Sequence, residues 1–507
     1  MALSAPAEPA TPSPLLPWLL LAALFAVPIV VTARPVGVPI LDPDIWWHLQ
    51  VGQWVTEHRA VPETDPFSQI GPERRWVAYS WLYEVAVYAF HARLGLAGIV
   101  VFRLLLSLAI VAAVVSLVRR LEPRFLVAVL LTGLATLTLA ALFSERPWLF
   151  TVLFATLTLR VIVEFRAPEC SRLPWGVWLL PLAYVVWANV HIQFVYGLFL
   201  LVLAVVAPLA QPWLDAWVGL APLTDDSARR VGTRRWRQLI ALAALCFVAT
   251  LVTPYHVRLY GVIVEYATQP GPFRWVNELK ALEFREPSDW VMLGLTAAAC
   301  YALGRRRPEA FELGLLASTA LFAFRARRDL WFVVLADLAI LASFAPRDVP
   351  AGQRFRAGRI GLAILSAALL ALAALLFRVR GLNEDNLNAK VATVFPARAV
   401  DFVQLRGYRG PLFNDFNWGG YLIWTLPQLP VAIDGRTNLY GDERIERYGR
   451  VWSGLPGWQD DPDLSAAALV IAPRDTALVS LLAFDERFLL VYEDELASVF
   501  VRQDRQR

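Results

Sequence analysis

Long apolar runs recur along most of this chain, and they constrain its fold more than any other feature. A helix that crosses a lipid bilayer needs roughly 20 consecutive apolar residues. Runs near this length occur at 15–31, 96–118, 125–143, 148–164, 175–190, 194–210, 238–253, 289–304, 310–324, 330–345 and 360–378. The run at 81–91 is shorter and contains Glu84, so we expect an interfacial helix there. The pattern predicts a polytopic α-helical membrane bundle of about eleven transmembrane helices.

The composition agrees with a membrane protein. Of 507 residues, 57% are hydrophobic and 18% are charged, whereas soluble domains are about 45–50% apolar. The net charge of +4 is small, and without a basic stripe it gives no case for nucleic-acid binding. The three cysteines, Cys170, Cys246 and Cys300, lie in or beside apolar segments without metal-site spacing. The first apolar run lacks a basic flank, so it is interpreted as an uncleaved span.

Arginine placement predicts the orientation, because positive residues collect on the cytoplasmic side. With a cytoplasmic N-terminus, the inner loops carry Arg119, Arg120 and Arg124; Arg166 and Arg172; Arg229, Arg230, Arg234, Arg235 and Arg237; Arg305, Arg306 and Arg307; Arg347, Arg354, Arg356 and Arg359. This orientation places residues 379–507 outside, in the periplasm or its equivalent. We therefore expect a transmembrane domain over 1–378, with a large first outer loop at 32–95, and an extracytoplasmic domain over 379–507.

The last part of the chain has shorter apolar runs. Those at 411–414, 430–434, 468–472 and 488–492 have strand length, and helical patterns lie between them at 397–405, 420–426, 443–452 and 476–484. Alternation of this kind predicts a small soluble α/β domain.

Polar side chains gather in the loops that this orientation places outside. The loops supply carboxylates, imidazoles and guanidiniums, and all five histidines fall on this side. The candidate site residues are Asp42, Asp44, His48, Asp65, Glu145, Arg146, Asn189, His191, His256, Arg258, Arg325 and Arg328, with Asp415, Trp418 and Tyr421 from the C-terminal part. Ionisable residues near membrane depth are a functional hypothesis by default. Arginine forks suit phosphate, and carboxylates suit a general base or a divalent cation.

Several of these residues also have structural interpretations. Asp44 precedes the helix-like run Ile45–His58 and could be its N-cap; His48, one turn later, would share its helix face. The remaining alternatives are interface-belt aromatics for Trp46 and Trp47, an ion pair between Glu145 and Arg146, polar helix ends for Asn189 and His191, and turns at Gly419–Gly420 and Asp434–Gly435. Asp329 could be the partner of the outer cluster Arg325, Arg327 and Arg328.

The acidic pair after the first span, followed by aromatics and His48, resembles the first outer loop of C-type glycosyltransferases. That superfamily includes protein mannosyltransferases, aminoarabinose transferases and the catalytic subunit of oligosaccharyltransferase. Its members carry an acidic residue there that acts on the acceptor or binds metal, and the resemblance places it at Asp42 or Asp44. The segments 64–68, 76–84, 144–150, 187–194, 253–260 and 325–333 also resemble a group of bacterial multispan proteins.

A second similarity lies in the C-terminal part. The stretches 414–421 and 433–438 resemble the Trp-Trp-Asp-Tyr-Gly region of oligosaccharyltransferase, which helps recognise the acceptor peptide. This chain lacks the paired tryptophan, since a single Trp418 follows Asp415. We therefore do not expect peptide sequon recognition.

The resemblance implies a glycosyltransferase in the bacterial plasma membrane. It would move a sugar from a polyprenyl-phosphate or polyprenyl-diphosphate donor to a glycan, lipid or protein acceptor at the outer face, with inversion. Asp44 would be the general base, supported by Asp42. Asp42, Asp44 and Asp65 could hold Mg²⁺ or Mn²⁺, and arginines would face the phosphate. The alternatives are a transporter or flippase for a lipid-linked or anionic solute, whose inverted repeats are not seen, and a non-catalytic envelope assembly protein.

Overall fold

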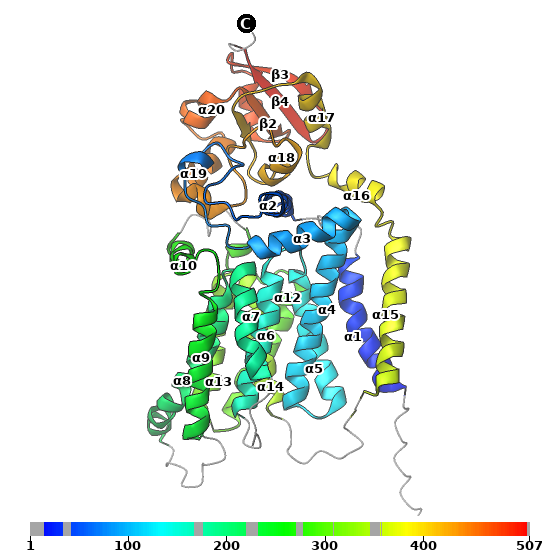
Figure 1. Ribbon diagram of the computed structural model, residues 1–507, viewed down its shortest axis with the longest axis vertical. Helices are drawn as coiled ribbons and strands as arrows, with labels where there is room; N and C mark the ends of the chain where they lie inside the picture. Colours follow the sequence, from blue (N-terminus) through cyan, green and yellow to red (C-terminus); the bar gives the residue numbers. More distant parts are fainter. Residues whose placement is uncertain are drawn as a thin grey trace, which may run out of the picture.

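The chain forms a helical bundle with a small mixed sheet at one end (Figure 1). The computed structural model describes residues 15–33, 42–166, 176–219, 232–269, 277–307, 309–344, 355 and 357–503. The described N-terminal helix lies within the bundle, whereas the described C-terminal strand lies in the sheet at one end of the molecule's long axis. Cys170 and part of the arginines assigned to inner loops lie outside the described residues.

The bundle helices coincide with the predicted apolar runs. They are α1 (Leu16–Thr32), α4 (Leu96–Leu121), α5 (Phe125–Leu139), α6 (Trp148–Arg166), α7 (Gly176–Val190), α8 (Phe194–Trp217), α9 (Thr233–Ala249), α12 (Pro287–Gly304), α13 (Ala310–Arg325), α14 (Leu330–Ala342) and α15 (Arg359–Val379). Among the described residues, five helices are long and apolar enough to cross a membrane: α4, α5 with its 3-10 extension, α6, α8 and α15. The number of spans and their orientation stay predictions.

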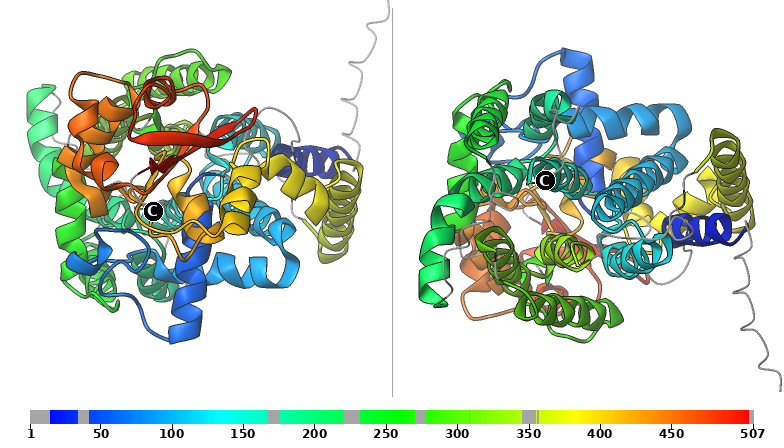
Figure 2. Two further views of the ribbon diagram at one scale, coloured as in Figure 1. Left: turned by 90° about the horizontal axis from the view of Figure 1, so that it is seen from above. Right: turned by 90° about the horizontal axis from the view of Figure 1, so that it is seen from below.

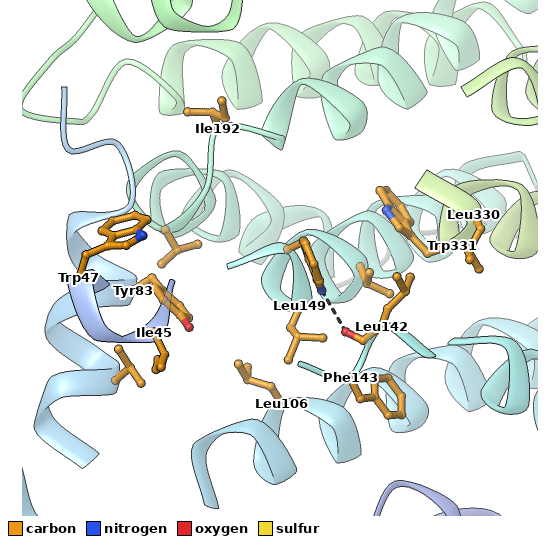
Figure 3. Close-up of a cluster of buried hydrophobic side chains, with 14 of the residues drawn as sticks. Ile45, Trp47, Tyr83, Leu106, Leu142, Phe143, Leu149, Ile192, Leu330 and Trp331 are labelled. Atoms are coloured by element: carbon orange, nitrogen blue, oxygen red, sulfur yellow. Dashed lines mark hydrogen bonds between the residues drawn. The ribbon is translucent and has the colours of Figure 1, made fainter. Parts of the chain in front are cut away.

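Helix α14 is the centre of the bundle. It packs against α4, α5, α6, α12 and α13, and nearly all of its residues are buried. Their near-continuous apolar sequence, LWFVVLADLAILA, is what a helix surrounded by others requires. Figure 3 shows part of the resulting core, in which Ile45, Trp47 and Tyr83 belong to the same buried cluster as Leu106, Leu149 and Trp331. The first outer loop therefore continues the bundle core upward.

Helices α1 and α15 form one edge of the molecule (Figure 2). They pack against each other, and no residue of α15 is buried. An apolar helix that leaves its surface uncovered requires a lipid environment. The same helix leads from the bundle to the C-terminal part.

The first outer loop folds into two helices that lie between the bundle and the sheet (Figure 1). These are α2 (Ile45–His58), with the predicted bounds, and α3 (Trp81–Leu94), joined through the 3-10 turn η1 (Gly71–Glu73). Helix α2 packs on α3 on one side and on α18 on the other. Trp46 and Trp47 are buried there, and Trp46 contacts Phe395 and Tyr421. The interface-belt interpretation of the two tryptophans was therefore wrong.

The C-terminal part contains a four-stranded sheet in the order β1-β2-β4-β3. The strands are β1 (Leu412–Asn414), β2 (Leu469–Pro473), β3 (Phe488–Glu493) and β4 (Ala497–Arg502), and the helices are α16 (Glu384–Val391), α17 (Ala397–Arg406), α18 (Gly419–Thr425), α19 (Thr437–Trp452), α20 (Pro462–Ala466) and α21 (Ala477–Leu482). β1 and β2 are parallel, and β4 is antiparallel to both β2 and β3. That the C-terminal part, residues 379–507, forms a domain separate from the bundle stays a prediction.

The strand predicted at 430–434 is wrong. This segment forms one bridge, between Val431 and Ser68, and the side chain of Asn414 takes the place of a strand ladder. Its amide donates to the Ile433 carbonyl at 2.8 Å, and its oxygen accepts from the Ala432 N–H at 2.9 Å. Strand β4 and helices α16 and α20 are present in addition to the predicted elements.

Candidate active site

A cavity of about 950 Å³ lies where the bundle, the first outer loop and the C-terminal part meet. Apolar residues in its lining include Val195, Phe199, Ile263 and Phe322 from α8, α10 (Arg258–Thr268) and α13. Polar residues in its lining include Asp44, His48, Tyr79, Arg146, His191, Tyr266, Glu278, Arg325, Arg328, Asp329, Asp415, Asn417, Arg436 and Thr437. The predicted convergence of separate outer loops on one site therefore occurs.

Arg146 lies close to three carboxylates. Its Nε lies 2.7 Å from Asp42 Oδ2, its Nη1 donates to Asp44 Oδ2, and its Nη2 lies 3.8 Å from Glu278. Asp44 is the N-cap residue of α2, but its side chain makes no capping hydrogen bond, so a purely capping role for this side chain is wrong. Asp42 instead accepts from the Asp44 N–H at 3.0 Å, which fixes the turn that enters α2. Three carboxylates thus converge on one guanidinium.

Asp44 is tuned by this environment. Burial raises its pKa to about 7; Arg146 acts in the opposite direction, while Asp42 and Glu278 raise it further. The Asp44 carboxyl group therefore changes its charge near neutral pH. A general base works best when its pKa lies near the working pH.

His48 lines the cavity one turn after Asp44, as the i, i+4 spacing predicts. Its Nδ1 lies 3.2 Å from Glu84 Oε1 in α3, and its ring lies on Trp47 with centroids 3.6 Å apart. Burial lowers the pKa of His48 and raises that of Glu84. Glu84 therefore holds the His48 imidazole in one orientation. The two side chains together carry no net positive charge at neutral pH.

His191 lines the cavity from the turn between α7 and α8. Its Nδ1 lies 2.9 Å from the Thr151 hydroxyl, which also accepts from the Trp187 indole N–H at 3.0 Å. Burial lowers the pKa of His191, and Arg328 and Arg146 lower it further. The residue is therefore a neutral hydrogen-bonding group beside two cations.

Arg325 and Arg328 reach the cavity from the short connection between α13 and α14. Arg328 Nη1 lies 3.8 Å from Glu278. Asp329 accepts a 2.8 Å hydrogen bond from the Tyr196 hydroxyl. Burial raises the pKa of Asp329 and Arg328 lowers it. Two guanidiniums therefore face the same cavity as the carboxylate cluster.

The C-terminal part supplies Asp415, Gly435 and Arg436 to the cavity. Arg436 is almost fully buried, and its guanidinium donates to Asp434 at 2.7 Å and to Asp65 at 2.6 Å. It also lies against three rings, those of Trp47, Phe67 and Trp76. This cluster ties the first outer loop to the segment after β1.

Eight predicted site residues do not line the cavity, among them Asp42, which bonds Arg146, and Asp65, which bonds Arg436. Glu145 is buried against Arg103 of α4 at 2.5 Å, so the proposed Glu145–Arg146 pair was wrong. Asn189 accepts from Trp81 Nε1 at 2.8 Å and donates to the Val185 and Val252 carbonyls, which ties helices together. The others are His256, bonded to the Leu251 carbonyl; Arg258, exposed; Trp418, which donates to the Val394 carbonyl; and Tyr421, stacked on Phe395.

Asp42, Asp44 and Asp65 do not fit a shared divalent cation. Asp65 is bound by Arg436 and accepts from the N–H groups of Phe67 and Ser68 at 3.1 and 3.0 Å, whereas Asp42 and Asp44 turn to Arg146. Across the part of the chain that the structure describes, no group of three His, Cys, Asp or Glu residues is arranged to hold a metal ion. The expected role of Asp65 as a metal ligand is replaced by a structural one.

Several cavity residues are not among the predicted site residues. Tyr266 lies on α10, which is not among the predicted helices, although the apolar spacing of Leu259, Val262 and Ile263 indicates a helix there. Glu278 and Arg436 also line the cavity. No pattern in the sequence indicates that Glu278 lies near Arg146 or that Arg436 bonds Asp65.

Solved structures with a similar fold are glycosyltransferases. The archaeal oligosaccharyltransferase AglB from Archaeoglobus fulgidus, in complex with an inhibitory peptide and a dolichol-phosphate, has a TM-score of 0.50 and 8% identity over 91% of this chain and 70% of that chain. The same enzyme tethered to an acceptor peptide gives 0.52 and 9%, over 91% and 69%. Arabinofuranosyltransferase AftD from Mycobacteria gives 0.50 and 15%, over 95% of this chain and 40% of that chain.

The chain has the fold of these transferases. The resemblance to C-type glycosyltransferases is thereby confirmed at the level of the fold. No protein-family model matches the sequence, and no curated protein sequence matches it either.

Proposed function

We propose that the protein transfers a sugar from a polyprenyl-phosphate or polyprenyl-diphosphate donor to an acceptor at the outer face of the membrane. One observation carries this proposal: a single cavity is lined both by apolar residues, suited to a lipid chain, and by polar residues that include the tunable carboxylate of Asp44 and the guanidiniums of Arg325 and Arg328. The fold shared with glycosyltransferases supports the same reaction class.

In this reaction Asp44 is the general base. The acceptor oxygen attacks the anomeric carbon and gives its proton to the Asp44 carboxylate. The bond from the anomeric carbon to the phosphate oxygen breaks, and its electron pair stays on the phosphate. A single displacement of this kind inverts the anomeric centre. Asp42 supports the turn that presents Asp44, through its hydrogen bond to the Asp44 N–H.

The leaving lipid phosphate gains negative charge, which Arg325 and Arg328 stabilise from the adjacent wall of the cavity. Guanidinium groups suit this task because their planar fork can bond two phosphate oxygens at once. His191 is a neutral hydrogen-bonding group beside them. The apolar residues of the lining, Phe199 and Phe322 among them, hold the first isoprene units of the lipid.

The test is transfer from radiolabelled polyprenyl-phosphate sugars by purified protein in vesicles. Asp44→Asn is compared with the parent and with Asp475→Asn, which alters an exposed carboxylate before α21. We expect loss of about 10²- to 10⁴-fold in the Asp44 variant alone, the usual contribution of a general base. Equal transfer by all three proteins would contradict the assignment of the base. Movement of lipid or solute across the vesicle, with no transfer from any donor, would favour the transporter alternative.

A further inference from the structure

The segment 433–436 of the C-terminal part touches the candidate base directly. A Cβ atom added at Gly435 would lie 1.9 Å from Asp44 Oδ1 and 2.7 Å from its Cγ. Real Cβ atoms essentially never approach that closely. The Asp44 carboxylate therefore occupies the space that any side chain at position 435 would take.

The carboxylate is held from two sides. Arg146, in the turn just before α6, bonds Oδ2, and the Gly435 backbone lies against Oδ1. The two contacts come from residues far apart in the chain. The Asp44 carboxylate cannot rotate toward position 435, because the Gly435 backbone is already in contact with it. If it rotated away from Arg146, it would lose its ion pair.

The segment itself is fixed, so its contact with Asp44 is not incidental. Asn414 bonds the backbone of Ala432 and Ile433. The first turn of α18 packs so closely on it that a Cβ at Gly419 would lie 2.1 Å from the Ile433 carbonyl. Rigid surroundings of this kind make a backbone surface precise enough to set a side-chain position.

Arg436 completes the support. It bonds Asp434 on its own segment and Asp65 in the first outer loop, so the residue next to Gly435 is anchored to the loop that carries Asp44. The Tyr440 hydroxyl also donates to Asp434. The C-terminal segment and the base are therefore held in one rigid unit.

We propose that Gly435 is the positioning residue for Asp44, and that residues 433–436 are a part of the catalytic site supplied by the C-terminal part of the chain. The inference rests on the proposed function, in which Asp44 takes the proton of the acceptor. A methyl group at position 435 displaces the carboxylate from Arg146 and from the acceptor. A displacement of about 1 Å in a reacting group can cost about 100-fold in rate.

The test compares Gly435→Ala with Gly261→Ala on α10, where an added Cβ meets nothing within 4 Å. In the transfer assay we expect kcat to fall about 100-fold in the first variant. The KM for the donor should be unchanged, because no atom of Arg325 or Arg328, which face the donor phosphate in the proposed function, is among the atoms nearest to a Cβ at position 435. The Gly261 variant keeps the parent rate. In an Asp44→Asn background, Gly435→Ala should cause no further loss, because the residue that it positions is already gone. Parent-like kcat, or a further loss in that background, would overturn the inference.

A second measurement is independent of activity. Gly435→Ala should lower the unfolding temperature, and Asp44→Ala should restore it in the double variant, because the smaller side chain leaves room for the methyl group. A double variant no more stable than Gly435→Ala alone would refute the contact. If the parent transfers no sugar from any donor but stability is restored, the proposed function fails and the contact stands.

Discussion

Replacing Arg436 with methionine tests the cluster that joins the first outer loop to the C-terminal part. The guanidinium is almost fully buried, as are the carboxylates of Asp65 and Asp434 that it bonds. Methionine keeps much of the apolar contact with Trp76 and its neighbouring rings. The substitution therefore removes the charge and its hydrogen bonds while largely conserving packing.

The expected loss of stability is large. Removing one partner of a buried ion pair leaves an uncompensated charge and typically costs about 3–5 kcal/mol. Here two carboxylates lose their cation, and only part of their hydrogen bonding remains: Tyr440 still donates to Asp434, and the N–H groups of Phe67 and Ser68 still donate to Asp65. We therefore expect a loss of about 3–5 kcal/mol in the free energy of unfolding.

The assay is chemical unfolding in detergent micelles, followed by tryptophan fluorescence. Arg450→Met is the matched control, because this arginine is exposed on α19, the helix that Arg436 precedes as its N-cap residue. Arg436→Lys should be intermediate, since an ammonium group keeps the charge but cannot reproduce the fork that reaches both carboxylates. A loss below about 0.5 kcal/mol for Arg436→Met, the range of ordinary surface changes, would refute the reasoning.

Three further predictions follow from the site and its supports. Because burial raises the pKa of Asp44 to about 7, its ionised, basic form grows as pH rises through neutrality, so kcat should rise with a midpoint near that value; a profile flat across neutral pH would contradict it. Arg328→Gln should weaken donor binding by about 1.5–3 kcal/mol, measured with the labelled lipid, if this guanidinium contacts the phosphate; unchanged binding would remove it from the site. Gly52→Ala should lower the unfolding temperature, because its Cβ would lie 2.2 Å from the Glu84 carbonyl where α2 crosses α3; an unchanged temperature would mean that the two helices separate easily.

The bundle was predictable because its helices are long apolar runs, which little else than a membrane span explains. Helix α2 was also predictable, since an acidic residue precedes a helical pattern with the bounds later found. The segment 430–434 was not, because its apolar residues are buried without a partner strand. The side chain of Asn414 bonds its backbone in place of a neighbouring strand. Hydrophobic periodicity does not reveal a hydrogen bond of this kind.

The candidate site was predictable in its residue types but not in its pairings. Because their loops are all predicted to lie on the outer side of the membrane, Asp44, His48, Arg146 and Arg328 belong to one predicted site. All four line the cavity. Which carboxylate meets which arginine depends on how separate loops fold together. Neighbours in sequence, Glu145 and Arg146, turn in different directions, and this is set by tertiary packing rather than by any local pattern.

The bond between Arg436 and Asp65 also bears on how the protein is made. The two residues are 371 positions apart, and a ribosome adds about 5–20 residues per second, so Asp65 leaves the ribosome roughly 20 to 75 s before its partner. Throughout that interval the loop that carries Asp44 lacks the segment 433–436, which contacts it in the finished chain. A chain released before residue 436 therefore lacks the guanidinium that bonds Asp65, and this carboxylate, buried in the finished protein, is left without that ion pair.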